Sequence, residues 1–281
     1  TLSHRFARHI KIPDASRIFL MTGMAAGFAG LFQTPLAATF FALEVLTVGE
    51  LQLMALYPAL IASIVASFTS HALGLEKFAV PLKETLSWTP ETLIKVALLG
   101  LAFGLAGKLF AVSLSWLKKT VAKVLPNPYI RIAVIGAGLS LILLTLQLTK
   151  VGSYSGLGTN LIDVAFHQGS AQSYDWILKL LFTVVTISAG YQGGEVTPLF
   201  AIGATLGVFL APLLGLPVLV VAAIGYASVF GSATTTLLAP ILIGGEVFGY
   251  GNLPFFVIAC AIAYCLPKEW SIYSGQKVAK K

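Results

Sequence analysis

The sequence predicts an all-α, polytopic membrane protein, and three observations support this fold class. Of its 281 residues, 57% are hydrophobic and only 10% are charged, and the mean hydropathy is +0.89. An average globular chain carries about 25% charged residues, which cover the surface that faces water. The chain also contains long windows without charge and many breaks at glycine or proline. The solvent expected for most of its surface is therefore the lipid bilayer.

The apolar segments differ in length, and this unevenness is typical of a transporter. Three of them, 51–73, 91–116 and 130–149, are long enough to span the hydrocarbon core as helices, which rise about 1.5 Å per residue. Shorter or interrupted segments indicate broken helices whose unwound backbone lines a cavity at membrane depth. Ordinary kinked spans are the alternative. The remaining helices are expected over 17–32, 34–48, 157–168, 174–189, 196–214, 216–231, 234–248, 253–266 and 269–279.

Glycine and proline mark most of the helix boundaries. Proline suits the first turn of a helix, because its missing N–H would be unpaired there, and glycine suits the residue after the last turn. A piece rich in glycine and serine, from Gly152 to Gly158, separates the third long span from the next helix. The other breaks lie at Pro35, Pro81, Pro90, Pro126, Gly190, Gly193, Pro198, Gly215, Pro217, Pro240, Pro254 and Pro267.

Two stretches of the chain resemble each other at a constant offset of 202. Residues 23–45, GMAAGFAGLFQTPLAATFFALEV, align without a gap on residues 225–247, GYASVFGSATTTLLAPILIGGEV. Both stretches end in Glu-Val, which is informative because the chain has only 11 acidic residues. Two related halves are the hypothesis that follows, as in many secondary transporters. Whether the halves are inverted depends on the number of spans between them, which the pattern leaves open.

Basic residues gather at segment ends and account for the net charge of +7. Such clusters anchor helices at the membrane surface and favour the cytoplasmic side. We therefore expect contacts with membrane lipids rather than nucleic acid, and we place the C-terminal tail in the cytoplasm together with the cluster from Lys118 to Lys123. The clusters comprise Arg5, Arg8, His9, Lys11 and Arg17; Lys118, Lys119 and Lys123; and Lys277, Lys280 and Lys281.

The stretch Gly193-Gly194-Glu195-Val196-Thr197-Pro198 contains the acidic residue that most needs an explanation. It opens the apolar helix 196–214, and its proline falls in the first turn. A helix N-terminus with free amides is a natural anion site. Because Glu195 has apolar sequence on both sides, we interpret it as an intramembrane carboxyl linked to an anion or a proton. A glutamate that caps its own helix at an aqueous surface is the alternative.

The remaining candidate residues have simpler interpretations. Thr197 adds a hydroxyl to the same helix start, unless that hydroxyl bonds its own backbone. Glu44 and Glu246 close the two repeats, and we expect each to be tied to backbone or to a basic partner. Tyr273 is typical of an aromatic at the membrane interface. Catalytic, metal-ligand and phosphate-binding motifs are absent from the sequence, so neither an enzyme nor a metal or cofactor site is expected.

With these residues in place, the chain resembles the CLC family of chloride channels and anion/proton antiporters. Residues 189–204, AGYQGGEVTPLFAIGA, look like the family's GxFxP segment and its helix, and Tyr273 falls at the family's pore-lining tyrosine. The resemblance implies a CLC fold with inverted repeats, in which broken or short tilted helices meet at the membrane midplane. It also implies a homodimer whose subunits each hold an anion pathway. That pathway is expected to involve Gly193, Gly194, Glu195, Val196, Thr197 and Tyr273.

Two departures from the family pattern favour its fluoride-selective branch, the bacterial CLC-type fluoride/proton antiporters. Val196 replaces the usual phenylalanine and Glu195 an apolar residue, while Val45 stands where many chloride/proton exchangers have a second glutamate. Fluoride is small and strongly hydrated, so it requires strong donors such as a hydroxyl or a protonated carboxyl. We therefore expect a proton-coupled fluoride exporter of the bacterial plasma membrane that uses Glu195 for proton transfer. The alternatives are a chloride channel or chloride/proton exchanger and, from other classes, an intramembrane enzyme or a scaffold.

The resemblance also implies an incomplete chain. The family's gating glutamate, in a GREG-type motif, and its central-site loop are expected before Thr1, and residues 1–10 would end the gate helix. On this basis we expect the end of the first half over 1–76, a linker over 77–90 and the second half over 91–266. Residues 267–281 would form a terminal helix and cytoplasmic tail.

Overall fold

The computed structural model describes residues 14–149 and 154–279 of the chain, which forms two compact units. Unit 1 comprises Thr1–Lys83, Thr235–Leu253 and Tyr273–Lys281, and unit 2 comprises Glu84–Thr234 and Pro254–Ile272. The expected gate-helix tail over 1–10 and the basic cluster from Arg5 to Lys11 lie outside the described residues. Each unit is discontinuous in sequence, so segments far apart along the chain build each core.

Five helices within the described ranges are long and apolar enough to cross a membrane. Shorter apolar helices accompany them, and this mixture confirms the all-α, polytopic prediction. The long ones are α2 (Ala15–Phe32), η1 with α4 (Leu53–Ala55 and Leu56–Ala72), α5 (Pro90–Val124), α6 (Pro128–Leu148) and α9 (Val196–Leu214). The shorter ones are α3 (Pro35–Glu44), α10 (Val218–Thr234), α11 (Leu238–Phe248), η3 (Tyr250–Asn252) and α12 (Leu253–Tyr264).

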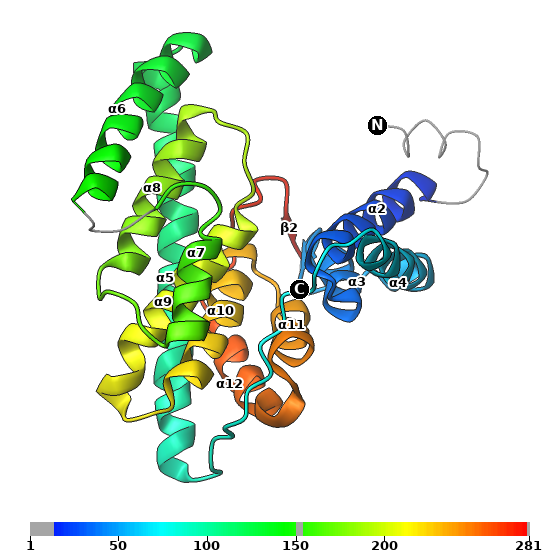
Figure 1. Cartoon of the computed structure of the whole chain (residues 1–281). Coiled ribbons are helices and arrows are strands. Elements are labelled where there is room, and N and C mark those ends of the chain that lie inside the picture. The colour runs from blue at the N-terminus through cyan, green and yellow to red at the C-terminus, as the bar shows by residue number, and fades with distance from the viewer. Residues whose placement is uncertain (1–13, 150–153, 280–281) are drawn as a thin grey trace. The chain divides into compact units, whose positions relative to one another are not determined.

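Unit 2 is built along α5, a helix of 35 residues. Thr89 caps its N-terminus, because the Thr89 hydroxyl accepts a hydrogen bond from the amide of Thr92 at 3.2 Å. The helix α8 (Asp175–Ala189) packs along α5, and α6 packs along the other side of α8 (Figure 1). A short α7 (Thr159–Asp163) and the π-helical turn η2 (Val164–Gln168) both contact α9.

Glycines bring the backbones of α9 and α10 into direct contact. Gly203 and Gly207 lie one turn apart on α9, opposite Gly225 and Ala222 of α10. A Cβ at Gly203 would collide with the carbonyl oxygen of Gly225, and one at Gly207 would lie 2.5 Å from the Cα of Ala222. Small residues four apart are typical of close helix pairs in membranes. This packing holds α9, and with it the helix start at Val196, in a fixed place within unit 2.

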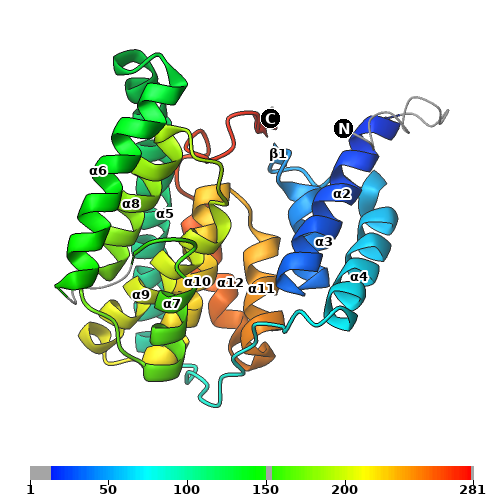
Figure 2. The same cartoon turned by 45° about the horizontal axis from the view of Figure 1, so that its top comes forward.

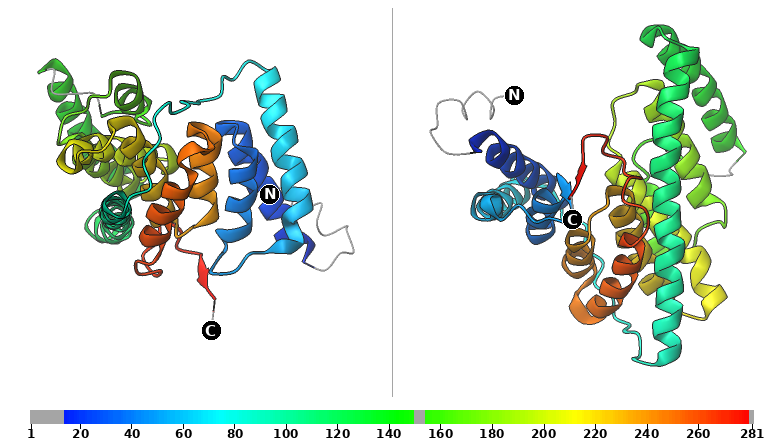
Figure 3. Two further views of the ribbon diagram at one scale, coloured as in Figure 1. Left: turned by 90° about the horizontal axis from the view of Figure 1, so that it is seen from below. Right: turned by 180° about the vertical axis from the view of Figure 1, so that it is seen from behind.

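Unit 1 consists of α2, α3 and α4 side by side, with α11 packed on α3 (Figure 2). Its core contains a small cluster of buried apolar side chains. A parallel pair of two-residue strands, β1 (Thr47–Val48) and β2 (Lys277–Val278), joins the end of the described chain to this unit (Figure 3). The core residues are Met21, Ala25, Ala42, Leu43, Ala55 and Ala59.

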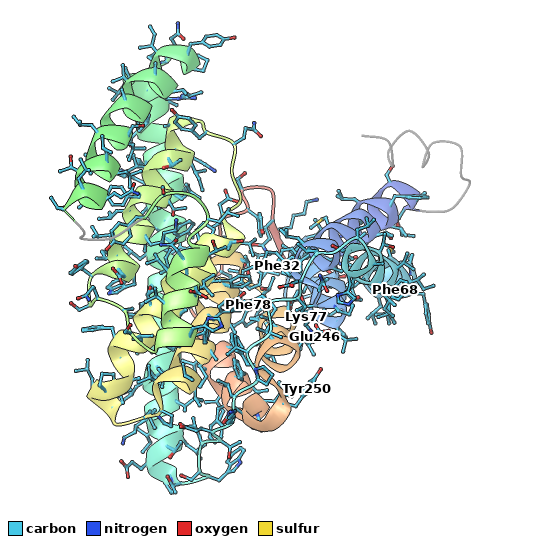
Figure 4. All side chains as sticks on the ribbon, in the orientation of Figure 1. Phe32, Phe68, Lys77, Phe78, Glu246 and Tyr250 are labelled. Carbon is cyan, nitrogen blue, oxygen red and sulfur yellow. The ribbon has the colours of Figure 1, made fainter. Side chains whose placement is uncertain are left out.

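Glu44 and Glu246 each bind the N-terminus of the other repeat's short helix. The Glu44 carboxylate, at the end of α3, accepts hydrogen bonds of 2.8–3.0 Å from the amides of residues 237–239, where α11 begins. The Glu246 carboxylate on α11 (Figure 4) accepts bonds of 3.1 and 2.8 Å from the amides of Leu36 and Ala37, where α3 begins. Negative charge at a helix N-terminus is favourable. The offset of 202 that aligns the two glutamates also aligns these amides, so the contacts repeat as the sequence does.

We expect Glu44→Ala to destabilise unit 1 more than Glu246→Ala does. The first substitution removes the acceptor from three amides and the second from two, and a buried donor left unpaired costs about 1–3 kcal/mol. Thermal denaturation of the purified protein in detergent measures the order of the melting temperatures. Glu50→Ala, at an exposed glutamate of the same unit, is the control. A Glu44→Ala protein as stable as this control would contradict the expectation.

The terminal helix expected over 269–279 is wrong. Residues 267–279 form turns and the strand β2 instead. Pro267 cannot extend α12, and the stretch that follows includes Ser271, Ser274 and Gly275, which are poor or mediocre helix formers. The Lys277 amide donates to the carbonyl of Leu46 at 3.1 Å, a ladder bond that a helix would not allow.

The structure confirms the linker expected before α5 but not the end expected for this helix. The linker expected over 77–90 lacks regular structure up to Thr89, as predicted, and α5 begins at Pro90. The same helix continues to Val124 instead of ending near 116. The boundaries expected for the two repeat halves stay a prediction, because the compact units group residues 235–253 with the start of the chain.

Candidate functional site

The site is built at the N-terminus of α9, where the chain leaves α8 through a glycine-rich turn. Gly190 ends α8 with φ +107°, a left-handed conformation that favours glycine. Residues 191–195 then lead into α9, which begins at Val196 and has Pro198 in its first turn. Gly193 and Gly194 have open space where a Cβ would stand. The helix start predicted from the sequence is therefore confirmed at this residue.

The Glu195 carboxylate does not cap its own helix. Glu195 is the N-cap residue and its carbonyl accepts a hydrogen bond from the Leu199 amide at 3.2 Å, but its side chain makes no capping bond. The alternative of a self-capping glutamate is therefore wrong. Instead, one carboxylate oxygen lies 3.6 Å from the Nζ atom of Lys118 on α5. The two side chains are 23% and 45% exposed, respectively, so the pair is only partly shielded from its surroundings.

The first turn of α9 offers hydrogen-bond donors that the described part of the chain does not use. The amides of Val196 and Thr197 and the hydroxyl of Thr197 have no partner among the described residues. Free amides at a helix N-terminus attract an anion, since the positive end of the helix dipole lies there. The alternative for Thr197, a hydroxyl bonded to its own backbone, is not what the structure has.

A cavity of about 440 Å³ adjoins this turn within unit 2. Its wall includes Gly193, Gly194 and Pro198 from the start of α9. The rest of the lining comes mainly from α6, α8 and residues 154–157, and it includes the buried Lys179. The predicted glycine pair is therefore one edge of a preformed cavity.

Two side chains fix the beginning of the turn to its neighbours. Arg131 on α6 donates from Nε to the carbonyl of Ala189 at 3.0 Å, and the Tyr191 hydroxyl donates to the carbonyl of Ile132 at 3.1 Å. Gly136 leaves room for the Tyr191 ring, since a Cβ there would collide with the Tyr191 hydroxyl. The turn is thus anchored before Gly193 and unobstructed at the glycine pair.

The other predicted site residue, Tyr273, belongs to unit 1. It stands in the turns that precede β2, and its ring meets the ring of Phe41 edge-on at a centroid distance of 6.3 Å. No helix begins at Tyr273, which corrects the expected placement at the start of a terminal helix. Glu44 and Glu246 bind backbone amides, as their structural interpretation expected.

Sequence reasoning missed Lys118 and Lys179 as members of the site. The sequence indicates only that Lys118 belongs to a basic cluster at a helix end, and its neighbours in sequence give no sign that it meets Glu195. Lys179 interrupts the otherwise apolar run of α8, and a lone lysine within such a run is the signal that could have identified it.

Comparisons with known proteins agree on one family. A family model described as voltage gated chloride channel matches residues 2–268. A "Chloride/fluoride channel protein" of Pseudomonas syringae pv. tomato is 38% identical over 265 residues, which are 93% of this chain and 58% of the relative. The chain therefore spans little more than half the length of that relative.

Solved structures agree with the sequence comparisons. The crystal structure of a CLC-type fluoride/proton antiporter superposes with a TM-score of 0.94 at 53% identity, over 99% of this chain and 70% of that one. A slow cyanobacterial Cl⁻/H⁺ antiporter superposes with a TM-score of 0.71 at 21% identity, over 90% and 61% of the two chains, and this likeness shows the fold alone.

Proposed function

Because the chain belongs to the voltage-gated chloride channel family, or CLC family, we propose that it exports fluoride across the bacterial plasma membrane in exchange for protons. The main observation in favour of this function is the position of the Glu195 carboxyl. It lies at the start of α9 without capping the helix, next to the Thr197 hydroxyl and to amides that have no partner among the described residues. The likeness to a CLC-type fluoride/proton antiporter at 53% identity supports the choice of ion.

The donors at the start of α9 suit fluoride better than a larger halide. Fluoride holds its hydration water strongly, so a site must replace that water with short, strong hydrogen bonds. The amides of Val196 and Thr197 and the Thr197 hydroxyl are donors of this kind, oriented by the helix. A protonated Glu195 would add a fourth donor, whereas an ionised one repels the anion. The protonation state of Glu195 thereby links proton and fluoride binding.

Fluoride and chloride efflux from proteoliposomes tests the choice of ion. We expect the reconstituted full-length protein to release fluoride much faster than chloride, and to take up protons as it does so. Fluoride-selective electrodes and a pH-sensitive dye inside the vesicles measure the two fluxes. Equal or chloride-favouring efflux would instead support a chloride channel or chloride/proton exchanger, and the absence of any ion flux would support a scaffold.

We also propose that the protein is a homodimer in the bacterial inner membrane with its C-terminal tail in the cytoplasm. The large apolar side chains that α4 leaves exposed, among them Tyr57, Ile61 and Phe68, suit a surface that faces lipid or a second copy of the chain. Light scattering of the detergent-purified protein measures the number of subunits, and protease accessibility in vesicles of known orientation locates the tail.

Lys118 is expected to assist fluoride capture without being essential to it. Its ammonium lies 3.6 Å from a carboxylate oxygen of Glu195, and its side chain is partly exposed. Loss of such an exposed ion pair should change the KM for fluoride by no more than about fivefold. We expect Lys118→Gln to raise the KM for fluoride within that limit while the maximal rate stays the same, and Lys118→Arg to retain the native KM. Lys123→Gln, in the same basic cluster, is the control. An unchanged KM in Lys118→Gln would remove Lys118 from the site.

A further inference from the structure

Lys179 on α8 is a buried cation that is held in place by backbone carbonyls. Its side chain is 1% exposed, and its ammonium donates to the carbonyls of Tyr154 at 3.2 Å and Gly156 at 2.7 Å. The surrounding chain is tight, because a Cβ at Gly158 would lie 2.7 Å from the Cε atom of Lys179. An ammonium has three N–H donors, and the described residues use two of them.

No carboxylate in the described part of the chain forms an ion pair with Lys179. Asp175, one turn earlier on α8, is occupied by the Tyr154 hydroxyl at 2.6 Å and the Gln172 amide at 2.8 Å. Burial, with the hydrogen bond to Asp175, raises the pKa of Tyr154, so that hydroxyl remains a donor to the carboxylate. A buried charge without a partner is unfavourable, because it loses the solvation that water provides. The ammonium of Lys179 therefore lacks a compensating negative charge.

A second buried lysine shows the contrast. Lys108 on α5 is 2% exposed and donates to the carbonyl of Trp270 at 2.8 Å, as Lys179 donates to its own carbonyl partners. Burial disfavours the Lys108 ammonium too, but the negative charge of Glu269 offsets part of that effect. Only Lys179 of these two lines the cavity beside the start of α9.

The cavity supplies the space and the donors that an anion requires. Thr183, whose hydroxyl has no partner among the described residues, and Ser140 line it together with Lys179. The volume of about 440 Å³ exceeds that of a small halide, so the ion would keep part of its water shell. The cavity extends to Gly193 and Gly194, which places such an ion next to the turn that carries Glu195.

We propose that this cavity binds a small monovalent inorganic anion, with Lys179 as its counter-charge and the Thr183 hydroxyl as a further donor. The inference rests on the proposed function in one respect, that an anion is the transported ion. This anion-binding cavity lies beside Gly193 and Gly194 and is separate from the amides at the start of α9. It compensates the buried ammonium and keeps an anion within reach of the Glu195 turn.

Bromide binding to the full-length protein tests this site independently of transport. In crystals soaked in bromide, we expect an anomalous peak within hydrogen-bond distance of Lys179 Nζ. Lys179→Met should remove this peak, and Lys179→Arg should retain it. Thr183→Val, which leaves the lysine and its carbonyl partners intact, should weaken bromide binding by about tenfold in calorimetric titration, the scale of one hydrogen bond to a charged group. Lys108→Met is the matched control for removal of a buried lysine.

Three outcomes would overturn the proposal. They are the absence of a bromide peak in the cavity of the native protein, a peak that persists in folded Lys179→Met, and a lipid phosphate in the cavity identified by native mass spectrometry. Because binding is measured without flux, these outcomes are distinct from a failure of fluoride selectivity. Bromide in the cavity of a protein that transports chloride would support the site and reject the ion assigned above.

Discussion

Glu195→Gln is expected to reduce proton-coupled fluoride efflux by about a hundredfold, the lower end of what a positioned proton-transfer group contributes. Glutamine keeps the size of the side chain and can still donate a hydrogen bond, but it cannot take up or release a proton. The carboxylate does not cap α9, so its replacement leaves the helix start intact. Folding should therefore change little. Paired measurements of fluoride release and proton uptake in proteoliposomes give the effect.

A second glutamate provides the matched control for this variant. Glu91 on α5 also lies beside a lysine, with an oxygen 2.6 Å from the Nζ atom of Lys95, and it is 75% exposed. Glu91→Gln should leave both fluxes at the native rate. Monodisperse Glu195→Gln protein with native, proton-coupled flux would show that the carboxyl has no part in transport. Fluoride leak without proton uptake would instead localise coupling to Glu195.

Gly203→Val is expected to prevent unit 2 from packing. Any Cβ at Gly203 meets the carbonyl oxygen of Gly225, which belongs to the backbone of α10 and cannot move away on its own. Overpacking a core typically costs about 1–3 kcal/mol, and a clash between two backbones falls at or above the upper end. The start of α9 would lose its fixed place as well. We expect little monodisperse protein in size-exclusion chromatography and a lower melting temperature in what remains.

Gly138→Val is the control that separates this packing effect from any general effect of replacing a helix glycine with valine. Gly138 is in α6, and nothing lies within 4 Å of a Cβ built there. Valine at this position should yield monodisperse protein with near-native melting temperature. Equal losses in the two variants would argue against the backbone contact between α9 and α10 as the cause.

Helix boundaries could be predicted from the sequence where proline or glycine defines them. The starts of α3 and α5 fall at Pro35 and Pro90, and α9 ends before Gly215. The apolar run closes before Lys118 and Lys119 and so predicts too early an end for α5, which continues to Val124. Lysine is a good helix former, and its long side chain can extend to water while the helix continues.

The chemistry of the site could be predicted only where it is local in the chain. The glycine pair, Glu195, Thr197 and Pro198 stand together in the sequence, and the helix N-terminus follows from their order. Lys118 and Lys179 come from other helices, and only the packing of α5 and α8 on α9 brings them near. Composition could not reveal that Tyr273 precedes a strand, since the pairing partner of β2 lies near the start of the chain.

The mutual capping of α3 and α11, in which a glutamate of each helix binds the first amides of the other, also sets an order of events during synthesis. Glu44 leaves the ribosome long before residues 237–239, so its acceptor oxygens have no amides to bind while all the helices from α4 to α10 are being made. Closing a contact across such a length of chain is slow compared with forming local helices. The contacts between α3 and α11 can therefore form only after α11 has been synthesised, and the pairing of β1 with β2 needs a segment that is later still in the chain.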